Sequence, residues 1–397
     1  MLSRVFHPHS EYESDAMMQK IMVKFIWTMV LLAGFLLFAE TLTAFSKPDE
    51  AILKLRKRCL AILYHAIESE NAYIRGAAAR AAGESGDKDL IPLLQKAATD
   101  VYHTTRLFAL QGFKNFSPEA AALTAKYLID DPNMWVKSTA MEMLGDLNRQ
   151  DARGLIRSRL KSPDRPVRLS AAAALYKLGE KESLALVLDT LEDSNSVVRY
   201  QAIGYIGKMK SQELLPHLTA LLNDPEDEVI FYSLKAIGNM AQPQMFPRLV
   251  ELTKSEHPSV RYQAVLIMGY LPADIVLKHV QELCQDADPM VRVSSAVAMN
   301  RLGSDGCIDV FEKELEHPDY GVRSSTARIM GEIDLPDRAK LLGRALQDEN
   351  TRVRTSSVRA VGMMGGPDAF PLLVSMLDDP EEAVRAYAAG NLLKLTR

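Results

Sequence analysis

The chain has 397 residues, and its 47 lysine and arginine side chains against 51 aspartate and glutamate side chains give a formal net charge of −4. Because a phosphate-binding surface normally carries a basic excess, this balance argues against a nucleic-acid-binding protein, although it allows a local basic patch. The three cysteines, Cys59, Cys284 and Cys307, show neither metal-ligand spacing nor a disulfide framework, and we interpret them as small core residues.

The first element in chain order is an apolar segment that follows a polar tail over residues 1–20. Residues 25–39, "FIWTMVLLAGFLLFA", contain no charged side chain. Extension to residues 21–45, with Lys24 reaching towards the interface, gives a hydrophobic helix long enough to span a membrane. We therefore expect a single-pass N-terminal membrane anchor. The alternative is a secretory signal peptide, cleaved near Ala44 or Ser46, which would leave an exported or periplasmic protein.

From about residue 49 to residue 397 the sequence repeats every 31 residues. The pentapeptide VRYQA stands at residues 198–202 and again at residues 260–264, two periods later. In the register of its arginine, ten of eleven positions are basic, and a fixed period of this length predicts a solenoid of stacked units. The register reads Arg75, Arg106, Lys137, Arg168, Arg199, Ile230, Arg261, Arg292, Arg323, Arg354 and Arg385.

The positions around this basic register predict that each unit is a pair of helices. Small or apolar residues recur one position before it and three, four and seven positions after it, which is one face of an amphipathic helix. Glycine stands eight positions after it in seven units, where it suits a helix end or a close backbone contact. An upstream apolar segment forms the other helix and ends in turns such as DDP or EHP. Eleven pairs predict an all-α superhelix, a rod or arc on the order of 100 Å long.

A second register lies six residues before the basic one. It holds aspartate in seven units and serine or histidine in the others. The aspartates are Asp100, Asp131, Asp193, Asp224, Asp286, Asp348 and Asp379. Such an aspartate accepts backbone N–H groups at a helix start and also meets the arginine guanidinium, so we expect a ladder of ion pairs. At Ile230 the register is interrupted, and we expect Asp224, which loses its partner within the unit, to use Arg199, Arg261 or water.

The aspartate, the six-residue spacing and the Val-Arg dipeptide resemble the HEAT repeat, especially the short regular type named after phycobilisome lyases. Prolines fourteen residues before the basic register match the proline that HEAT first helices often carry; they are Pro92, Pro216, Pro247 and Pro371. The resemblance covers residues 49–397. It implies a solenoid whose arginine-bearing helices line the concave face, and it says little about activity.

No catalytic or metal-binding motif is evident. Deoxyhypusine hydroxylases are similar in repeat architecture and carry paired His-Glu motifs, but this sequence has no His-Glu dipeptide, and its eight histidines fall at different repeat offsets. Walker loops, nucleophile elbows and zincin motifs are also missing from the sequence. We therefore expect a protein without enzymatic activity, metal or cofactor. The alternative is a HEAT-like enzyme or enzyme subunit, of lyase, isomerase or hydroxylase type, acting on a chromophore or a modified protein.

A candidate binding surface lies at the positions one and five residues after the basic register, which point away from the core side of the helix. In units five to eight, six of these eight positions are apolar, at Tyr200, Phe231, Tyr262, Leu266, Val293 and Val297. Contiguous exposed apolar surface is typical of protein-binding sites, so we expect an interaction scaffold for a protein or peptide partner on the concave face, with no nucleic acid bound. Alternatively, the helices tilt enough to bury these side chains as ordinary core.

Overall fold

The computed structural model describes residues 50–397, and in this part of the chain all regular structure is helical. The chain divides into two compact units, Met1–Lys57 and Arg58–Arg397. The predicted polar tail and the predicted anchor or signal segment, residues 1–20 and 21–45, lie outside the described residues. Among the helices of residues 50–397, none combines the length and the apolar character needed to cross a membrane.

Helices alternate in pairs along the described chain. The first helices of the pairs are α2 (Glu50–Ala66), α4 (Ile91–Ala97), α6 (Pro118–Leu128), α8 (Arg153–Ser158), α10 (Leu184–Thr190), α12 (Leu215–Ala220), α14 (Phe246–Leu252), α16 (Ala273–Glu282), α18 (Asp309–Leu315), α20 (Arg338–Ala345) and α22 (Gly366–Ser375). The second helices are α3 (Ala72–Ser85), α5 (His103–Phe113), α7 (Met134–Asp146), α9 (Arg165–Lys177), α11 (Ser196–Met209), α13 (Asp227–Ile237), α15 (Pro258–Met268), α17 (Pro289–Arg301), α19 (Tyr320–Met330), α21 (Thr351–Met364) and α23 (Glu382–Leu395). Short 3-10 turns flank most of the first helices.

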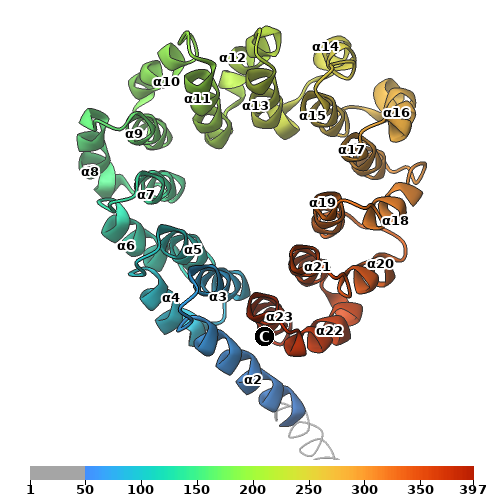
Figure 1. The fold of residues 1–397 in the computed structure, drawn as a ribbon. Coiled ribbons are helices and arrows are strands. Elements are labelled where there is room, and N and C mark those ends of the chain that lie inside the picture. The colour runs from blue at the N-terminus through green and yellow to red at the C-terminus, as the bar shows by residue number, and fades with distance from the viewer. Residues whose placement is uncertain (1–49) are drawn as a thin grey trace, which may run out of the picture. The chain divides into compact units, whose positions relative to one another are not determined.

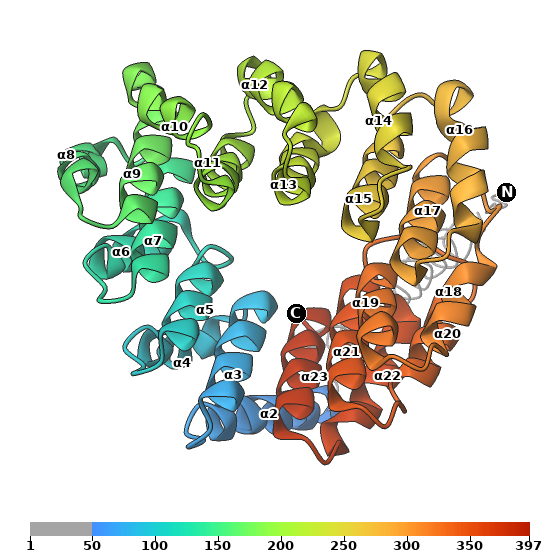
Figure 2. The same cartoon turned by 45° about the horizontal axis from the view of Figure 1, so that its top comes forward.

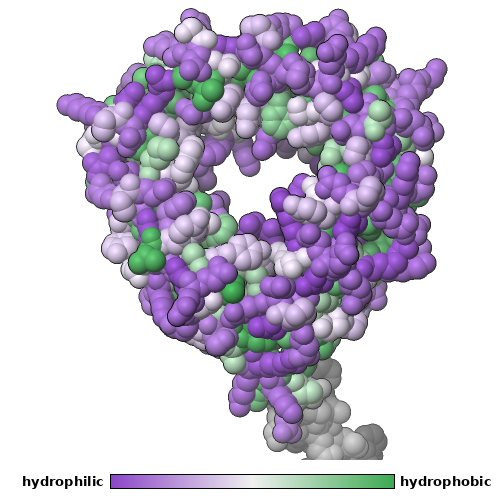
Figure 3. Space-filling model, viewed as in Figure 1, coloured by the Kyte–Doolittle hydropathy of each residue, from purple (hydrophilic) through white to green (hydrophobic). Residues whose placement is uncertain are grey.

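Residues 58–397, taken by themselves, form a closed ring and not the open rod or arc that the sequence suggested (Figure 1). The second helices line the inside, α4 to α22 lie outside, and α23 lies beside α3 in two views (Figure 2). A space-filling view shows an opening through the centre (Figure 3). Each pair turns in the same sense relative to the last, so the rotations add up to a full turn. The two end units then pack against each other, so each buries the face that an open solenoid has to cover with a capping repeat.

Small residues on the second helices allow neighbouring units to approach closely. A Cβ atom placed on Gly145 would lie 3.1 Å from Cα of Ala174, and one on Gly331 would lie 2.7 Å from Cα of Ala360. These glycines stand eight residues after the basic register, so the structure has the close backbone contact that the sequence predicts. The tight contact recurs at every second unit boundary: Gly83 with Gly112, Gly145 with Ala174, Gly207 with Ala236, Gly269 with Ala298 and Gly331 with Ala360. From α3 to α21 the packing period is therefore two units, whereas at the next boundary Gly362 meets the side chain of Asn391.

The ring closes at a seam, which we define as the contacts of α3 with α21 and α23. Gly390 of α23 approaches the backbone of α3 so closely that a Cβ atom on it would lie 2.7 Å from the carbonyl oxygen of Ala81. Across the same seam, Arg359 Nη2 donates to Glu84 Oε1 at 3.0 Å. The closure therefore combines a backbone contact with an ion pair between residues far apart in the sequence.

Cys284 and Cys307 form a disulfide, which corrects the interpretation of both as simple core cysteines. Their Cα atoms are 6.1 Å apart, and both side chains are buried. Cys284 follows α16 and Cys307 precedes α18, so the bond joins two consecutive units. The sequence gives no sign of it, because the two cysteines approach only after the units stack.

Removing this disulfide is expected to lower the free energy of unfolding by about 3 kcal/mol, because the bond restricts a short loop of the unfolded chain. Cys284→Ser and Cys307→Ser should lower the thermal midpoint equally, since either change removes the same bond, and the double variant should lower it no further. Calorimetry measures the midpoints, and non-reducing peptide mapping detects the linked peptides. Additive losses in the double variant would show that the bond is not formed.

Candidate functional site

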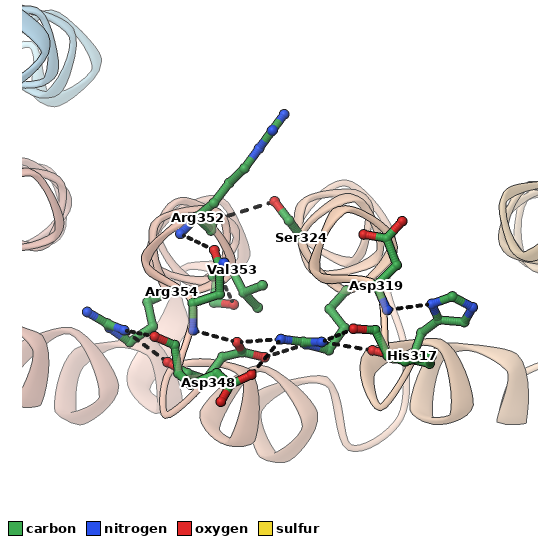
Figure 4. Close-up of polar contacts among 12 residues, drawn as sticks. His317, Asp319, Ser324, Asp348, Arg352, Val353 and Arg354 are labelled. Carbon is green, nitrogen blue, oxygen red and sulfur yellow. Dashed lines mark hydrogen bonds and ion pairs between the residues drawn. The ribbon is translucent and has the colours of Figure 1, made fainter.

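The arginine register forms ion pairs that join consecutive units (Figure 4). Nε and Nη2 of Arg323 donate to the two carboxylate oxygens of Asp348 at 2.7 and 2.9 Å. Nη1 of the same guanidinium donates to the carbonyl oxygens of His317 and Pro318, at 2.9 and 3.0 Å. Because Asp348 belongs to the next unit, each rung ties the turn of one unit to the turn of its neighbour. The ladder is a structural feature and leaves no guanidinium of these rungs open to a partner.

Most of the predicted ladder residues take part in such rungs, although the pairing is between units and not within them as expected. The same two-pronged pair occurs at Arg75–Asp100, Arg106–Asp131, Arg199–Asp224, Arg261–Asp286 and Arg354–Asp379. Arg292 pairs instead with the buried Glu314. Among residues 50–397, Arg168 and Arg385 donate to carbonyl oxygens of their own turns, and neither makes an ion pair. Asp193 lies 3.9 Å from Arg165.

The interruption at Ile230 leaves no carboxylate without a partner. Asp224 accepts from Arg199 at 2.9 and 2.7 Å, which is one of the three alternatives expected from the sequence. The idea that Asp224 loses a partner within its own unit was wrong, because the partner always comes from the preceding unit. The aspartate register 25 residues after Ile230 holds Ser255, so both members of that rung are missing together.

The residue in the aspartate register also holds the turn before the second helix. Asp348 Oδ1 accepts the N–H of Asn350 at 2.9 Å, and Ser255 Oγ accepts the N–H of His257 at 3.1 Å. A serine in this register therefore still holds the turn, but it forms no ion pair with an arginine. Lys137 is followed 25 residues later by serine as well, so the sequence changes donor and acceptor in concert at two places.

The electrostatics of the rungs favour charged carboxylates. Burial by itself raises the pKa of Asp348, but hydrogen bonds from Arg323 and from the N–H of Asn350, together with the charges of Arg323 and Arg354, bring it below its ordinary value. The pKa values of Asp100 and Asp286 are lowered by the same combination. These groups are therefore charged throughout the neutral range.

The inside of the ring carries an aromatic cluster, which we define as Tyr200, Phe231, Tyr232 and Tyr262. All four are half-buried, on α11, α13 and α15. The Tyr200 and Tyr232 rings stack with centroids 4.8 Å apart, and the Phe231 ring lies edge-on to Tyr232 and Tyr262 at 5.1 and 5.8 Å. Sequence reasoning named three of the four. It missed Tyr232, which stands two residues after the register, although its neighbour Phe231 marks the place.

The cluster offers apolar ring surface together with phenol groups. The pKa of Tyr262 is raised, mainly by burial and further by Tyr232 and Asp288, while Arg328 opposes the shift. Its hydroxyl therefore keeps its proton at neutral pH and can donate a hydrogen bond. Rings with a polar tip are the side chains that carry most energy in protein interfaces.

The other predicted contact residues divide by helix. Leu266 on α15 is half-buried beside the cluster, whereas Val293 and Val297 on α17 are 0% and 2% exposed and cannot touch a partner. Their prediction as contact residues is therefore corrected. Around these two residues α17 packs tightly on α15, where a Cβ atom on Gly269 would lie 3.0 Å from Cα of Ala298. For α17 the expectation of burial by neighbouring helices is the one that holds.

Metal-ligating side chains do not gather anywhere in residues 50–397: no group of three or more histidine, cysteine, aspartate or glutamate residues there could hold a metal ion. His279, the histidine with the clearest contacts, has its pKa lowered, first by burial, and its Nε2 lies 2.9 Å from the hydroxyl of Thr253.

Comparison with known proteins matches a model of HEAT repeats over residues 121–203, 185–258, 246–313 and 308–394. No curated protein matches this sequence. Among solved structures, human deoxyhypusine hydroxylase in complex with glycerol is 18% identical, with a TM-score of 0.34, over 78% of this chain and 96% of that one. Kap121p is 13% identical, with a TM-score of 0.39, over 84% of this chain and 45% of that one. Kap121p bound to Ste12p gives 13% identity and a TM-score of 0.40 over 83% and 44% of the two chains.

The chain thus spans less than half the length of Kap121p. The repeat model carries more weight, because its four overlapping segments together run from residue 121 to residue 394, more than half of the chain. They coincide with the helix pairs α6/α7 to α22/α23. The chain belongs to the family of HEAT-repeat proteins.

Proposed function

We propose that this protein is a non-enzymatic scaffold that binds a protein or peptide segment on the inner face of its ring, at the aromatic cluster. The observation that carries the proposal is the continuous contact of four half-buried rings across three consecutive second helices. Aromatic side chains concentrate binding energy at interfaces, and rings held in mutual contact lose little freedom when a partner arrives. An extended or helical segment fits such a row better than a broad globular surface does.

We further infer that the repeats are of the short phycobilisome-lyase type, which their 31-residue period supports. For location we propose a membrane-anchored or exported protein. The apolar segment at residues 21–45 supports this, and so does the buried disulfide Cys284–Cys307, because disulfides persist in oxidising compartments outside the cytosol.

Phe231→Asp tests the proposed site, because it places a carboxylate among the rings. A partner that binds there would have to remove the water around this charge. We expect at least an order of magnitude less partner protein to co-purify from native membranes, as quantified by mass spectrometry. Leu186→Asp on the outer helix α10 is the matched control, since it places the same charge at an exposed leucine away from the cluster. Circular dichroism checks that both variants keep their helicity. Equal recovery of the same partner with Phe231→Asp and wild type would refute the proposed site.

A further inference from the structure

The seam holds a cavity that depends on ring closure. Its volume is about 630 Å³, and its lining comes from α3, α5, α21 and α23, helices at opposite ends of the repeat array. Aromatic side chains form much of the wall: Tyr73, Tyr102, Phe108 and Tyr387. Tyr73 and Tyr102 are 59% and 45% exposed, so the cavity opens to solvent on their side. The volume is within the range of sites that hold small ligands or single side chains.

Positive charge is in excess at this cavity. Arg80 and Arg352 line it, and no aspartate or glutamate does. Arg80 Nε and Arg359 Nη2 share one carboxylate oxygen, Glu84 Oε1, at 2.9 and 3.0 Å. Glu84 therefore offsets the charge of Arg80, whereas no carboxylate in the lining offsets that of Arg352, and burial beside aromatic rings strengthens the remaining positive field.

Arg352 is the guanidinium that remains available. Its side chain extends away from the ladder, and the dashed lines of Figure 4 involve only its backbone atoms. Within residues 50–397 its guanidinium makes no hydrogen bond or ion pair. Thr355, one helical turn further along α21, also lines the cavity, and its hydroxyl is buried without a hydrogen-bond partner in the described chain. A buried polar atom without a partner is costly, and a ligand can satisfy it.

The aromatic wall indicates that a ligand of this cavity carries an apolar group next to its anionic group. The Arg80 guanidinium lies over the Phe108 ring at 5.2 Å, so the charge and the apolar surface are adjacent. Tyr387 is 6% exposed, and burial above all raises its pKa to about 12, so its phenol stays neutral beside the arginines. The cavity therefore presents guanidinium groups together with uncharged rings.

We propose that the seam cavity binds a peptide carboxylate that stands next to an aromatic side chain. Arg352 takes the carboxylate, and the rings of Tyr73, Tyr102 and Phe108 enclose the apolar group. The inference rests on the proposed peptide-binding function, but it assigns a second site. This site lies where the two ends of the repeat array meet, whereas the aromatic cluster lies on α11, α13 and α15. Because four helices from both ends of the array build it, the site is complete only when the ring is closed.

Isothermal titration calorimetry with two probes on the full chain tests this site. The probes are acetyl-Gly-Phe-Asp-Gly-amide and the same peptide with asparagine in place of aspartate. We expect the wild type to bind the aspartate peptide at least tenfold more tightly than the asparagine peptide. In Arg352→Gln that preference should disappear. Arg344→Gln on the outer helix α20 is the control. It also removes one arginine, at a position outside the cavity lining, and should keep the preference for the aspartate peptide.

Two results would overturn the site: a wild type that shows no preference for the aspartate peptide, or an Arg352→Gln variant that retains it. Phe231→Asp separates this inference from the proposed function, since it should keep the preference while it loses the native partner. Loss of the partner in Phe231→Asp with no peptide preference in the wild type would remove the seam site alone. Undiminished partner recovery in Phe231→Asp together with a preference that depends on Arg352 would remove the aromatic cluster alone.

Discussion

Gly390→Leu is expected to open the ring of residues 58–397. A side chain at this position has no room, because even its Cβ atom would lie 2.7 Å from the carbonyl oxygen of Ala81 and 2.9 Å from its Cβ. Overpacking of a tight contact costs about 1–3 kcal/mol, and here the strain is relieved by separation of the two end units. The expected result is a larger radius of gyration in small-angle X-ray scattering, with helicity unchanged.

Gly204→Leu is the matched control for this change. Gly204 stands at the same position of its unit, five residues after the basic register, but a Cβ atom on it would meet nothing within 4 Å. The same glycine-to-leucine change in a second helix should therefore leave the radius of gyration as in the wild type. Equal scattering curves for Gly390→Leu, Gly204→Leu and wild type would contradict a closed seam.

A cross-link between α3 and α23 tests the seam with less strain than Gly390→Leu introduces. In Ala81→Cys/Gly390→Cys the two Cβ atoms start 2.9 Å apart, and a disulfide needs about 3.8 Å, a small adjustment. An open solenoid keeps its end units too far apart for this bond. Oxidation should therefore produce an intramolecular link that changes the mobility of the chain in a non-reducing gel.

Repeat period and helix pairing could be predicted from the sequence because both are local. The Val-Arg register and its small neighbours define one helix face, and the second helix of each pair, from α3 to α23, carries that face as expected. Ring closure could not be predicted in this way, because it depends on the sum of many small rotations between units. Gly390 and Ala81 are more than 300 residues apart, and no pattern within one unit connects them.

The candidate site was predictable only in part, for a related reason. Phe231 and Tyr262 could be placed on the inner face by their offset from the register, but whether an offset is open depends on how closely the next unit approaches. At the same offset from the register, Val293 is fully buried whereas Tyr262 is half-buried. The partner of each arginine was hidden for the same reason. Aspartates stand both six residues before and 25 residues after Arg354, and only stacking selects the second.

Breaking one rung of the ladder is expected to destabilise the ring strongly, and removing both of its members much less. Arg323→Ile leaves Asp348, whose side chain is 11% exposed, without its guanidinium, and the loss of one partner of a buried pair costs about 3–5 kcal/mol. The double variant Arg323→Ile/Asp348→Ser reproduces the combination that the chain itself uses at Ile230 and Ser255. Serine can still accept the N–H that holds the turn, so we expect the double variant to recover more than half of the loss. Urea unfolding followed by circular dichroism measures Arg323→Ile, Asp348→Ser and the double variant, and strictly additive losses would contradict the pairing.

The same rung should also control stability in acid. Folding lowers the pKa of Asp348 from its ordinary value of 3.8, so its charge contributes stability that is fully present above that value and is lost as the pH falls through the folded-state pKa. Asp348→Asn removes the charge at every pH. The difference in unfolding midpoint between wild type and Asp348→Asn should therefore be constant from about pH 7 to pH 5 and shrink below about pH 4, where the Asp348 carboxylate of the unfolded chain begins to take up its proton. A difference that stayed constant down to pH 2 would show that the rung is held by shape and hydrogen bonds, and not by charge.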